Sequence, residues 1–143
     1  MADTLRQTIL SKIGEVLEGV SGVEKVEIER STPVDIDTIP FATCFVYSGP
    51  EERATDDRST IGFETFDWTV VIEVWVRNDD CETLLGAIHK AMFNNYSFGG
   101  YALNSKRKAV TMELLDVSKE LKAMVVQYSV LYRHLNGQPD KLS

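Results

Sequence analysis

The sequence has few of the residues on which metal centres and disulfide frameworks depend. Its 143 residues include only two cysteines, Cys44 and Cys81, and two histidines, His89 and His134. Two thiols without a C-x-x-C spacing cannot build a disulfide framework, so we interpret both as reduced, small apolar residues. Cys81 and His89 share an expected helix but fall about two turns apart, which does not suit a shared metal ligand set. We expect no metal and no cofactor.

Positive charge is also scarce. Lys and Arg number 15 against 22 Asp and Glu, which gives a net charge of −7. Clustered Lys and Arg are needed to bind the DNA backbone or an anionic membrane, so we expect neither specific nucleic-acid binding nor membrane binding. The start of the chain lacks the apolar core of a signal peptide, and no apolar run approaches the roughly 20 residues of a membrane span. We therefore expect the protein to be made and kept in a reducing cytoplasm.

The usual catalytic patterns are missing as well. The sequence contains neither the G-x-S-x-G of a nucleophile elbow nor the G-x-x-x-x-G-K-[ST] of a phosphate-binding loop. The pair Asp56-Asp57 lies in an expected loop, where a site cannot be preorganised, and Asp79-Asp80 precedes an expected helix, which explains it. Gly99-Gly100, flanked by aromatic residues, indicates a turn with positive φ. We expect a protein that is not an enzyme.

Hydrophobic periodicity predicts two helices and five strands. The strongest pattern runs from Phe66 to Val76, where apolar residues occupy every second position, as in a long strand with one face in the core. Because this strand is long for a small domain, we expect that part of it projects or carries a bulge. Val71 and Trp75 on its other side indicate that the second face is partly covered. The expected elements are helix 3–20, strands 23–29, 42–47 and 66–76, helix 81–94, and strands 109–117 and 121–133.

This order, α-β-β-β-α-β-β, predicts an α+β fold. Two amphipathic helices need an apolar surface to cover, and a mixed or antiparallel sheet of about five strands with both helices packed on one face provides it. Thr4 or Asp3 caps the first helix with capping-box spacing, and Asp79 caps the second. The last two strands form an antiparallel hairpin. We expect one domain over residues 1–135, followed by a flexible polar tail at 136–143.

Two charged segments are candidates for contact with other proteins. Residues 49–60 contain six charged residues of both signs and little to bury, which indicates a solvent-exposed loop. It is either an assembly contact with a copy of the same chain or a plain surface loop. The one basic cluster, Lys106-Arg107-Lys108, either contacts an acidic neighbouring subunit or is the solvated start of a strand. The candidate interface residues are Glu51, Glu52, Arg53, Asp56, Asp57, Arg58, Lys106, Arg107 and Lys108.

Several features together recur in one protein family. An amphipathic helix leads through Gly22-Val23 into a strand, and a strand that runs from Pro40 to Gly49 precedes a charged loop. The long 66–77 strand is followed by a helix and the Gly99-Gly100 turn, and the last strand ends at 128–133 with YSVLYR. In this layout residues 3–135 resemble the tail terminator, or tail completion, family of long-tailed phages.

The resemblance implies a structural role. Members of that family form a ring, usually of six copies, on the head-proximal end of the tail tube. The ring stops tube polymerisation and offers a docking surface to the head connector. The implied partners are copies of the same chain, the tail tube protein and the connector, with DNA passing through the lumen. The implied location is the virion tail, after assembly in the host cytoplasm.

Two alternatives remain at this stage. The chain could be another head–tail joining or neck protein, since related small tail proteins share the α+β layout. It could instead be a small oligomeric ligand-binding module, with Trp75 and Tyr132 lining a site at a subunit interface. Packing in a core or an interface explains the same two residues.

Overall fold

A computed structural model describes residues 4–30, 42–53, 63–77, 80–116, 121–135 and 138–142 of the chain. Within these residues the expected order α-β-β-β-α-β-β is confirmed, and one short strand follows it. The elements are α1 (Leu5–Glu18), β1 (Lys25–Ile28), β2 (Thr43–Arg53), β3 (Phe63–Arg77), α2 (Cys81–Asn94), β4 (Asn104–Asp116), β5 (Leu121–Leu135) and β6 (Gln138–Leu142).

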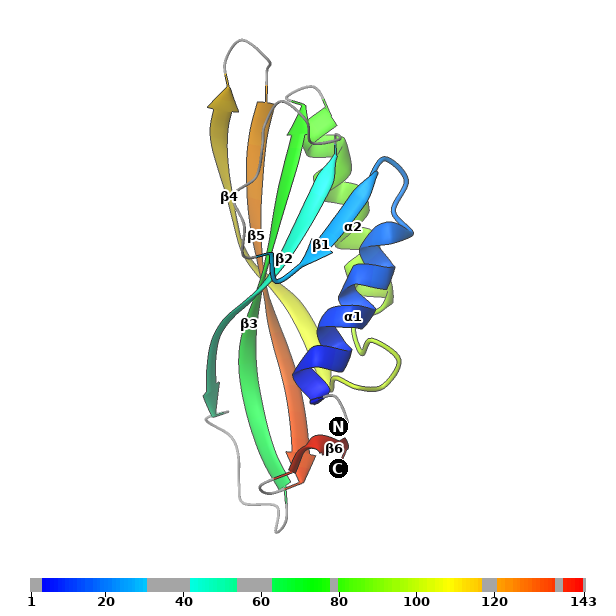
Figure 1. Cartoon of the computed structure of the whole chain (residues 1–143), viewed down its shortest axis with the longest axis vertical. Helices are drawn as coiled ribbons and strands as arrows, with labels where there is room; N and C mark the ends of the chain where they lie inside the picture. Colours follow the sequence, from blue (N-terminus) through cyan, green and yellow to red (C-terminus); the bar gives the residue numbers. More distant parts are fainter. Residues whose placement is uncertain are drawn as a thin grey trace.

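The strands form one twisted, mixed sheet (Figure 1). Its order is β1-β2-β3-β5-β4, with β6 paired to the end of β5 outside this path. β1 runs parallel to β2, and every other pairing is antiparallel. The predicted α+β class with a mixed sheet is therefore confirmed, as is the antiparallel pairing of the last two predicted strands.

The centre of the sheet is the pairing of β3 with β5. It runs without a register shift from Phe63 opposite Leu135 to Arg77 opposite Leu121. Both strands continue beyond the helices at the lower end of Figure 1, so the expectation that β3 projects is confirmed. A bulge occurs in the strand beside it, because the register between β2 and β3 shifts between Ser48 and Glu51.

β2 corrects the prediction of a loop that begins at Gly49. The strand passes through Gly49 and Pro50 and ends at Arg53, pairing with Phe66 of β3. Gly49 and Pro50 lie in the register shift, where a bulge accommodates the missing amide of proline. β1 pairs only with Thr43 to Val46 of β2. The part of β2 that contains Gly49 and Pro50 therefore has β3 as its one neighbour among the described strands. An edge position is where a strand tolerates proline.

The two helices begin as the sequence indicates, with one correction. Thr4 caps α1, and its side chain and that of Gln7 form the predicted capping box. The range predicted for α2 matches the observed bounds. Its N-cap position is held by Asp80, whose side chain makes no capping hydrogen bond, while Asp79 lies outside the described residues. The cap predicted from the Asp-Asp pair is therefore not the one observed.

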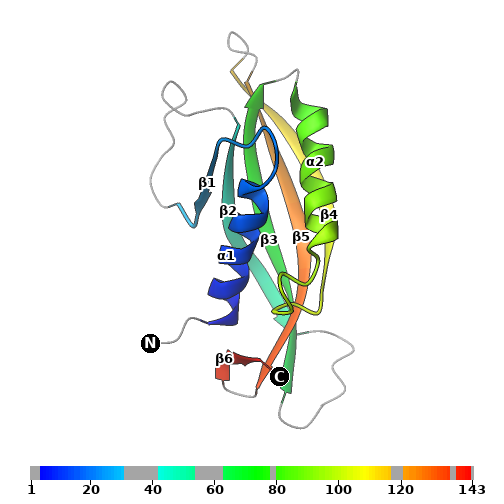
Figure 2. The ribbon, with the colours of Figure 1, turned by 90° about the vertical axis from the view of Figure 1, so that its right-hand side faces the viewer.

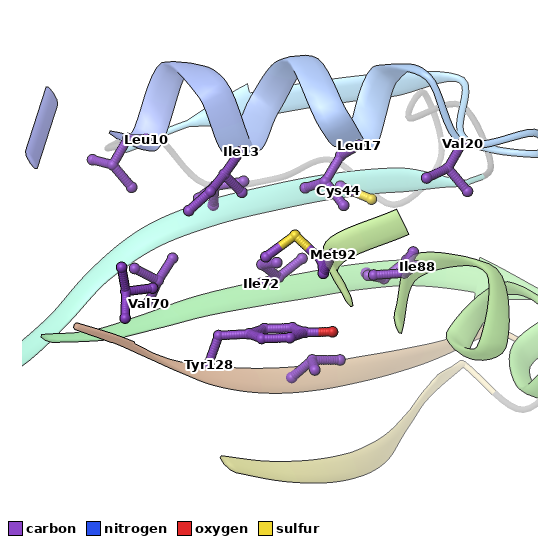
Figure 3. Close-up of a cluster of buried hydrophobic side chains, with 14 of the residues drawn as sticks. Leu10, Ile13, Leu17, Val20, Cys44, Val70, Ile72, Ile88, Met92 and Tyr128 are labelled. Carbon is purple, nitrogen blue, oxygen red and sulfur yellow. The ribbon is translucent and has the colours of Figure 1, made fainter. Parts of the chain in front are cut away.

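Both helices cover the same face of the sheet, as predicted (Figure 2). α1 packs on β1 and β2, and α2 packs on β4 and β5. The core lies between this helix layer and the sheet, and Figure 3 shows Ile13 and Leu17 of α1 facing Ile72 of β3. Among its largest fully buried members are Trp68, Tyr128, Ile9, Ile13, Leu17, Ile72, Ile88 and Met92.

The opposite face of the sheet has no helix on it among the described elements, and it is only partly buried. Phe45 is buried there and meets Trp75 edge-on, with ring centroids 5.8 Å apart. Trp75 donates its indole N–H to Glu73 at 2.8 Å. Val71 and Trp75 are half-buried, as expected from their positions. We call this surface the open face.

The glycine turn and the C-terminal segment complete the fold. Gly99 and Gly100 have φ values of 75° and 92°, which confirms the predicted turn with positive φ. Phe98 beside them is buried in the core. In the segment predicted to be a flexible tail, residues 138–142 form β6, which pairs with His134 and Leu135.

Candidate subunit interface

The acidic candidates Glu51 and Glu52 lie on opposite faces of the β2 end. Glu51 is on the helix side, where it accepts a hydrogen bond from the Tyr132 hydroxyl and lies 3.8 Å from the Arg6 guanidinium. Glu52 is exposed and pairs in register with Asp67. The predicted interface residue Glu51 is therefore held inside its own subunit, and Glu52 is the acid that faces outward.

Arg53, the third candidate on β2, is also engaged within the subunit. Its guanidinium lies 3.3 Å from the Glu64 carboxylate and 5.8 Å from the centre of the Phe66 ring. These contacts fix the last residue of β2 against the projecting part of β3. The remaining candidates of this segment, Asp56, Asp57 and Arg58, lie outside the described residues.

The basic candidates Lys106, Arg107 and Lys108 lie within β4, not before it. β4 starts at Asn104, because the backbone of this segment finds a partner in β5. Lys106 pairs with Ser129 on the open face, and Arg107 pairs with Tyr128 on the helix side. Lys108 falls in a register shift and donates to the Thr69 hydroxyl at 3.4 Å. The three cations thus diverge around one edge of the sheet.

That edge is the outer side of β4. The only strand paired with β4 in the described part of the chain is β5, so the backbone groups of its other side have no partner strand there. The exposed residues along it include Thr111, Met112 and Glu113. An unpaired strand of this length offers a template on which another chain can add a strand. The register shift at Lys108 and the lysines limit such pairing to the remainder of the strand.

A groove of about 490 Å³ lies beside this edge, between α2 and β4. His89, Met92 and Phe93 line it from α2, Arg107 from β4, and Tyr128 from β5. The His89 Nδ1 and the Tyr128 hydroxyl are 3.4 Å apart. Burial raises the pKa of Tyr128 to about 12, against a smaller lowering by Arg107, so the phenol stays protonated at neutral pH. The groove therefore has an apolar floor and a positively charged rim.

Two exposed apolar side chains line the groove, and the sequence analysis did not single them out as site residues. Phe93 is 72% exposed and Tyr96 is 52% exposed. Large apolar residues gathered in this way mark contact surfaces more often than scattered ones do. The signal available in the sequence was Phe93, which lies outside the apolar stripe of its helix and has no core to face.

The two residues proposed for a ligand site do not come together. Tyr132 faces the helix side, buried against Trp68 with ring centroids 5.9 Å apart, whereas Trp75 lies on the open face. Both cysteines are free and buried, and burial raises the pKa of Cys44 to about 12. In the described ranges no three His, Cys, Asp or Glu residues are grouped so that they could hold a metal ion. Neither described helix has the length and apolarity needed to cross a membrane.

Comparisons with known proteins give little to add to this geometry. No protein-family model matches the sequence, and no curated protein matches it. Among solved structures, the matching chains include one from "Virion of native gene transfer agent (GTA) particle". It is 12% identical, and the alignment covers 90% of this chain and 92% of that chain. At a TM-score of 0.36 the likeness supports no conclusion about the fold or the function of this chain.

Proposed function

We propose that the protein is a structural subunit of a phage-type virion, without enzymatic activity, that assembles with copies of itself at the head-proximal end of a tail tube. In this role its ring ends tube polymerisation and gives the head connector a docking surface. The proposal takes the domain to span residues 1–135 and needs neither cofactor nor metal. Its partners are the tail tube protein, the connector and further copies of the chain, and DNA passes through the lumen.

The observation that carries the proposal is the edge of the sheet at β4. It combines strand backbone that has no partner strand in the described part of the chain, exposed Phe93 and Tyr96, and the cations Lys106 and Arg107 around one groove. Protein interfaces are enriched in aromatic residues and arginine, whereas free surfaces are rich in lysine and glutamate. A surface of this composition fits a protein partner better than a small substrate.

The remaining architecture supports the same role. A ring subunit must present different surfaces to its neighbours and to the structures above and below it. Here the ends of β3 and β5 extend beyond the helix layer (Figure 1), away from the part of the sheet that the helices cover. The order of elements is the one that the terminator resemblance implies.

The test is assembly with a tail tube. Tube protein from the same genome is polymerised with and without this protein, and tube lengths are measured by electron microscopy while light scattering gives the mass of the free protein. We expect tubes of limited length with this protein on one end. Tubes that grow to the same length with and without it would contradict the terminator role. Binding to the connector but not to the tube would indicate a neck protein instead.

A further inference from the structure

We propose that copies of this chain assemble head to tail, with the β4 edge and its groove on one copy binding the α1–β1 edge of the next. The inference rests on the self-assembly part of the proposed function and names the two surfaces that meet. The basic edge is defined as Lys106 and Arg107 with the exposed Phe93 and Tyr96 beside them. The acidic edge is defined as Glu18, Glu24 and Glu29.

The two edges lie at opposite sides of the sheet. β1 and β4 are the outermost strands of the order β1-β2-β3-β5-β4, and α1 packs beside β1 (Figure 2). A contact between two different surfaces of the same protein is heterologous, and it closes into a ring when the rotation allows. The topology therefore provides the two unlike surfaces that a ring requires.

The charges of these edges are complementary. Glu18, Glu24 and Glu29 are all exposed, Glu18 at the end of α1 and the other two on either side of β1. Neither Glu18 nor Glu24 forms an ion pair with a described residue, and the same holds for Lys106 and Arg107. These four groups are thus available for charges on a neighbouring copy. Complementary charge guides association and fixes the relative orientation of the partners.

The acidic edge also breaks a local rule of helix electrostatics. Glu18 is the last residue of α1, and the last turn of the helix contains no basic residue. The carbonyl end of a helix carries partial negative charge, so carboxylates there are unfavourable and cations are preferred. A neighbouring basic edge would compensate this repulsion, which gives the unusual placement a physical purpose in the assembly.

A twofold contact between two β4 edges fits less well. Such a dimer would place Lys106 and Arg107 of both copies in the same interface. Like charges that face each other across paired strands destabilise the pairing. The same argument applies to two acidic edges, so the head-to-tail contact is the one that brings unlike charges together at both surfaces of each copy.

Paired charge reversal tests the proposal. One variant carries Lys106→Glu with Arg107→Glu, so both of its edges are acidic, and the other carries Glu18→Lys with Glu24→Lys, so both are basic. We expect light scattering to show assembly of the wild-type chain, monomers for each variant alone, and assembly again in their equimolar mixture. Because the two variants must alternate, the mixture closes only into rings with an even number of copies.

Controls separate this inference from the proposed function. Lys90→Glu changes an exposed cation of α2 that belongs to neither edge, because it lines the hollow between the two helices. This variant should assemble like the wild type. Circular dichroism checks that every variant is folded. Wild-type assembly combined with a mixture that stays monomeric would overturn the head-to-tail contact and leave self-assembly standing. A wild-type chain that stays monomeric at every concentration, alone and with tube protein, would overturn both.

The apolar part of the contact has a separate readout. Phe93→Ser removes a ring that is 72% exposed, so the fold of the monomer should not change. Buried aromatic anchors carry much of the binding energy in protein interfaces, and we expect the dissociation constant of the assembly to rise by about tenfold or more. Assembly should also weaken when ionic strength rises from about 0.05 M to about 0.5 M, because salt screens the charges. An unchanged dissociation constant for Phe93→Ser would exclude the groove from the contact.

Discussion

The two faces of β3 show how differently one strand can be used. On the helix side Trp68, Val70 and Ile72 have no exposed surface, whereas their neighbours Val71 and Trp75 on the open face are half-buried. The helix side is closed by α1 and α2, whereas no described helix lies on the open face (Figure 2). Folding energy therefore concentrates on one side of the sheet, and the other side depends on local contacts between strands.

The largest expected effect on stability comes from truncating two adjacent residues of β3, one on each face of the sheet. Ile72→Ala removes a fully buried side chain from the helix side, and we expect it to cost about 2–5 kcal/mol of unfolding free energy. Val71→Ala removes a half-buried side chain one residue away, and we expect a cost of about 1 kcal/mol or less. Urea unfolding of both variants measures the difference. Equal costs would show that the open face is as tightly packed as the core.

The bulge in β2 gives the next largest effect. A Cβ at Gly49 would lie 2.7 Å from the backbone oxygen of Thr69, which is too close for any side chain. Because that atom belongs to the central strand, Gly49→Ala must displace backbone, and we expect a cost of about 1–3 kcal/mol. Thermal unfolding measures it. A variant as stable as the wild type would mean that this part of the β2–β3 pairing is loose.

Alanine at Gly86, in the helix layer, should change stability in the opposite direction. A Cβ at Gly86 meets nothing within 4 Å, and the residue lies inside α2. Alanine restricts the unfolded chain and favours the helix, so Gly86→Ala should stabilise the protein by about 0.5–1 kcal/mol. The same thermal unfolding assay gives the result. Destabilisation would mean that this exposed helix surface is occupied in solution.

The smallest effect concerns an ion pair at the β1 edge of the sheet. The Arg30 hydrogen bond at 2.5 Å, with help from Lys25, lowers the pKa of Glu27 below its ordinary 4.5. A lowered folded pKa gives stability that is present above the ordinary value and is lost as pH falls through the folded value. We expect Glu27→Gln to cost at most about 1 kcal/mol at pH 7, since the pair is partly exposed.

The pH dependence supplies the control for that pair. Below the folded pKa of Glu27 the carboxylate is protonated in both states, so wild type and Glu27→Gln should unfold with the same free energy. Urea unfolding in a series of buffers from pH 7 downwards shows whether the difference between the two proteins disappears as the pH falls. A difference that persists at low pH would mean that the glutamine disturbs the strand by its shape and not by its charge.

How far the sequence could predict this fold depended on whether a signal was local or distant. The alternation from Phe66 to Val76 and the stripe of α2 are local patterns, and both elements were predicted with nearly correct bounds. The second half of β2 was missed because Gly49-Pro50 is a strong local stop signal. Its pairing with Phe66 to Trp68 is a tertiary contact that overrides this signal.

The candidate interface shows the same difference between local signals and tertiary contacts. The basic cluster at Lys106 and Arg107 was visible as charge, and its position on an edge strand follows only from the sheet order. Phe93 could have been noticed because it lies outside the apolar stripe of α2, whereas Tyr96 follows the helix and its exposure depends on tertiary neighbours that the sequence does not show. Glu51 was chosen for its charge, but the Tyr132 hydroxyl and Arg6 hold it within the subunit.

The uninterrupted pairing of β3 with β5 also bears on how the chain folds. Arg77 pairs with Leu121 and Phe63 with Leu135, so pairing the two central strands closes a loop of the chain that contains α2 and β4. Closing such long loops costs entropy before any contact repays it, and proteins rich in non-local pairs fold slowly. During that delay the edges of the half-built sheet are open to other chains, so the strand pairing that would build an ordered assembly would also drive aggregation of nascent copies.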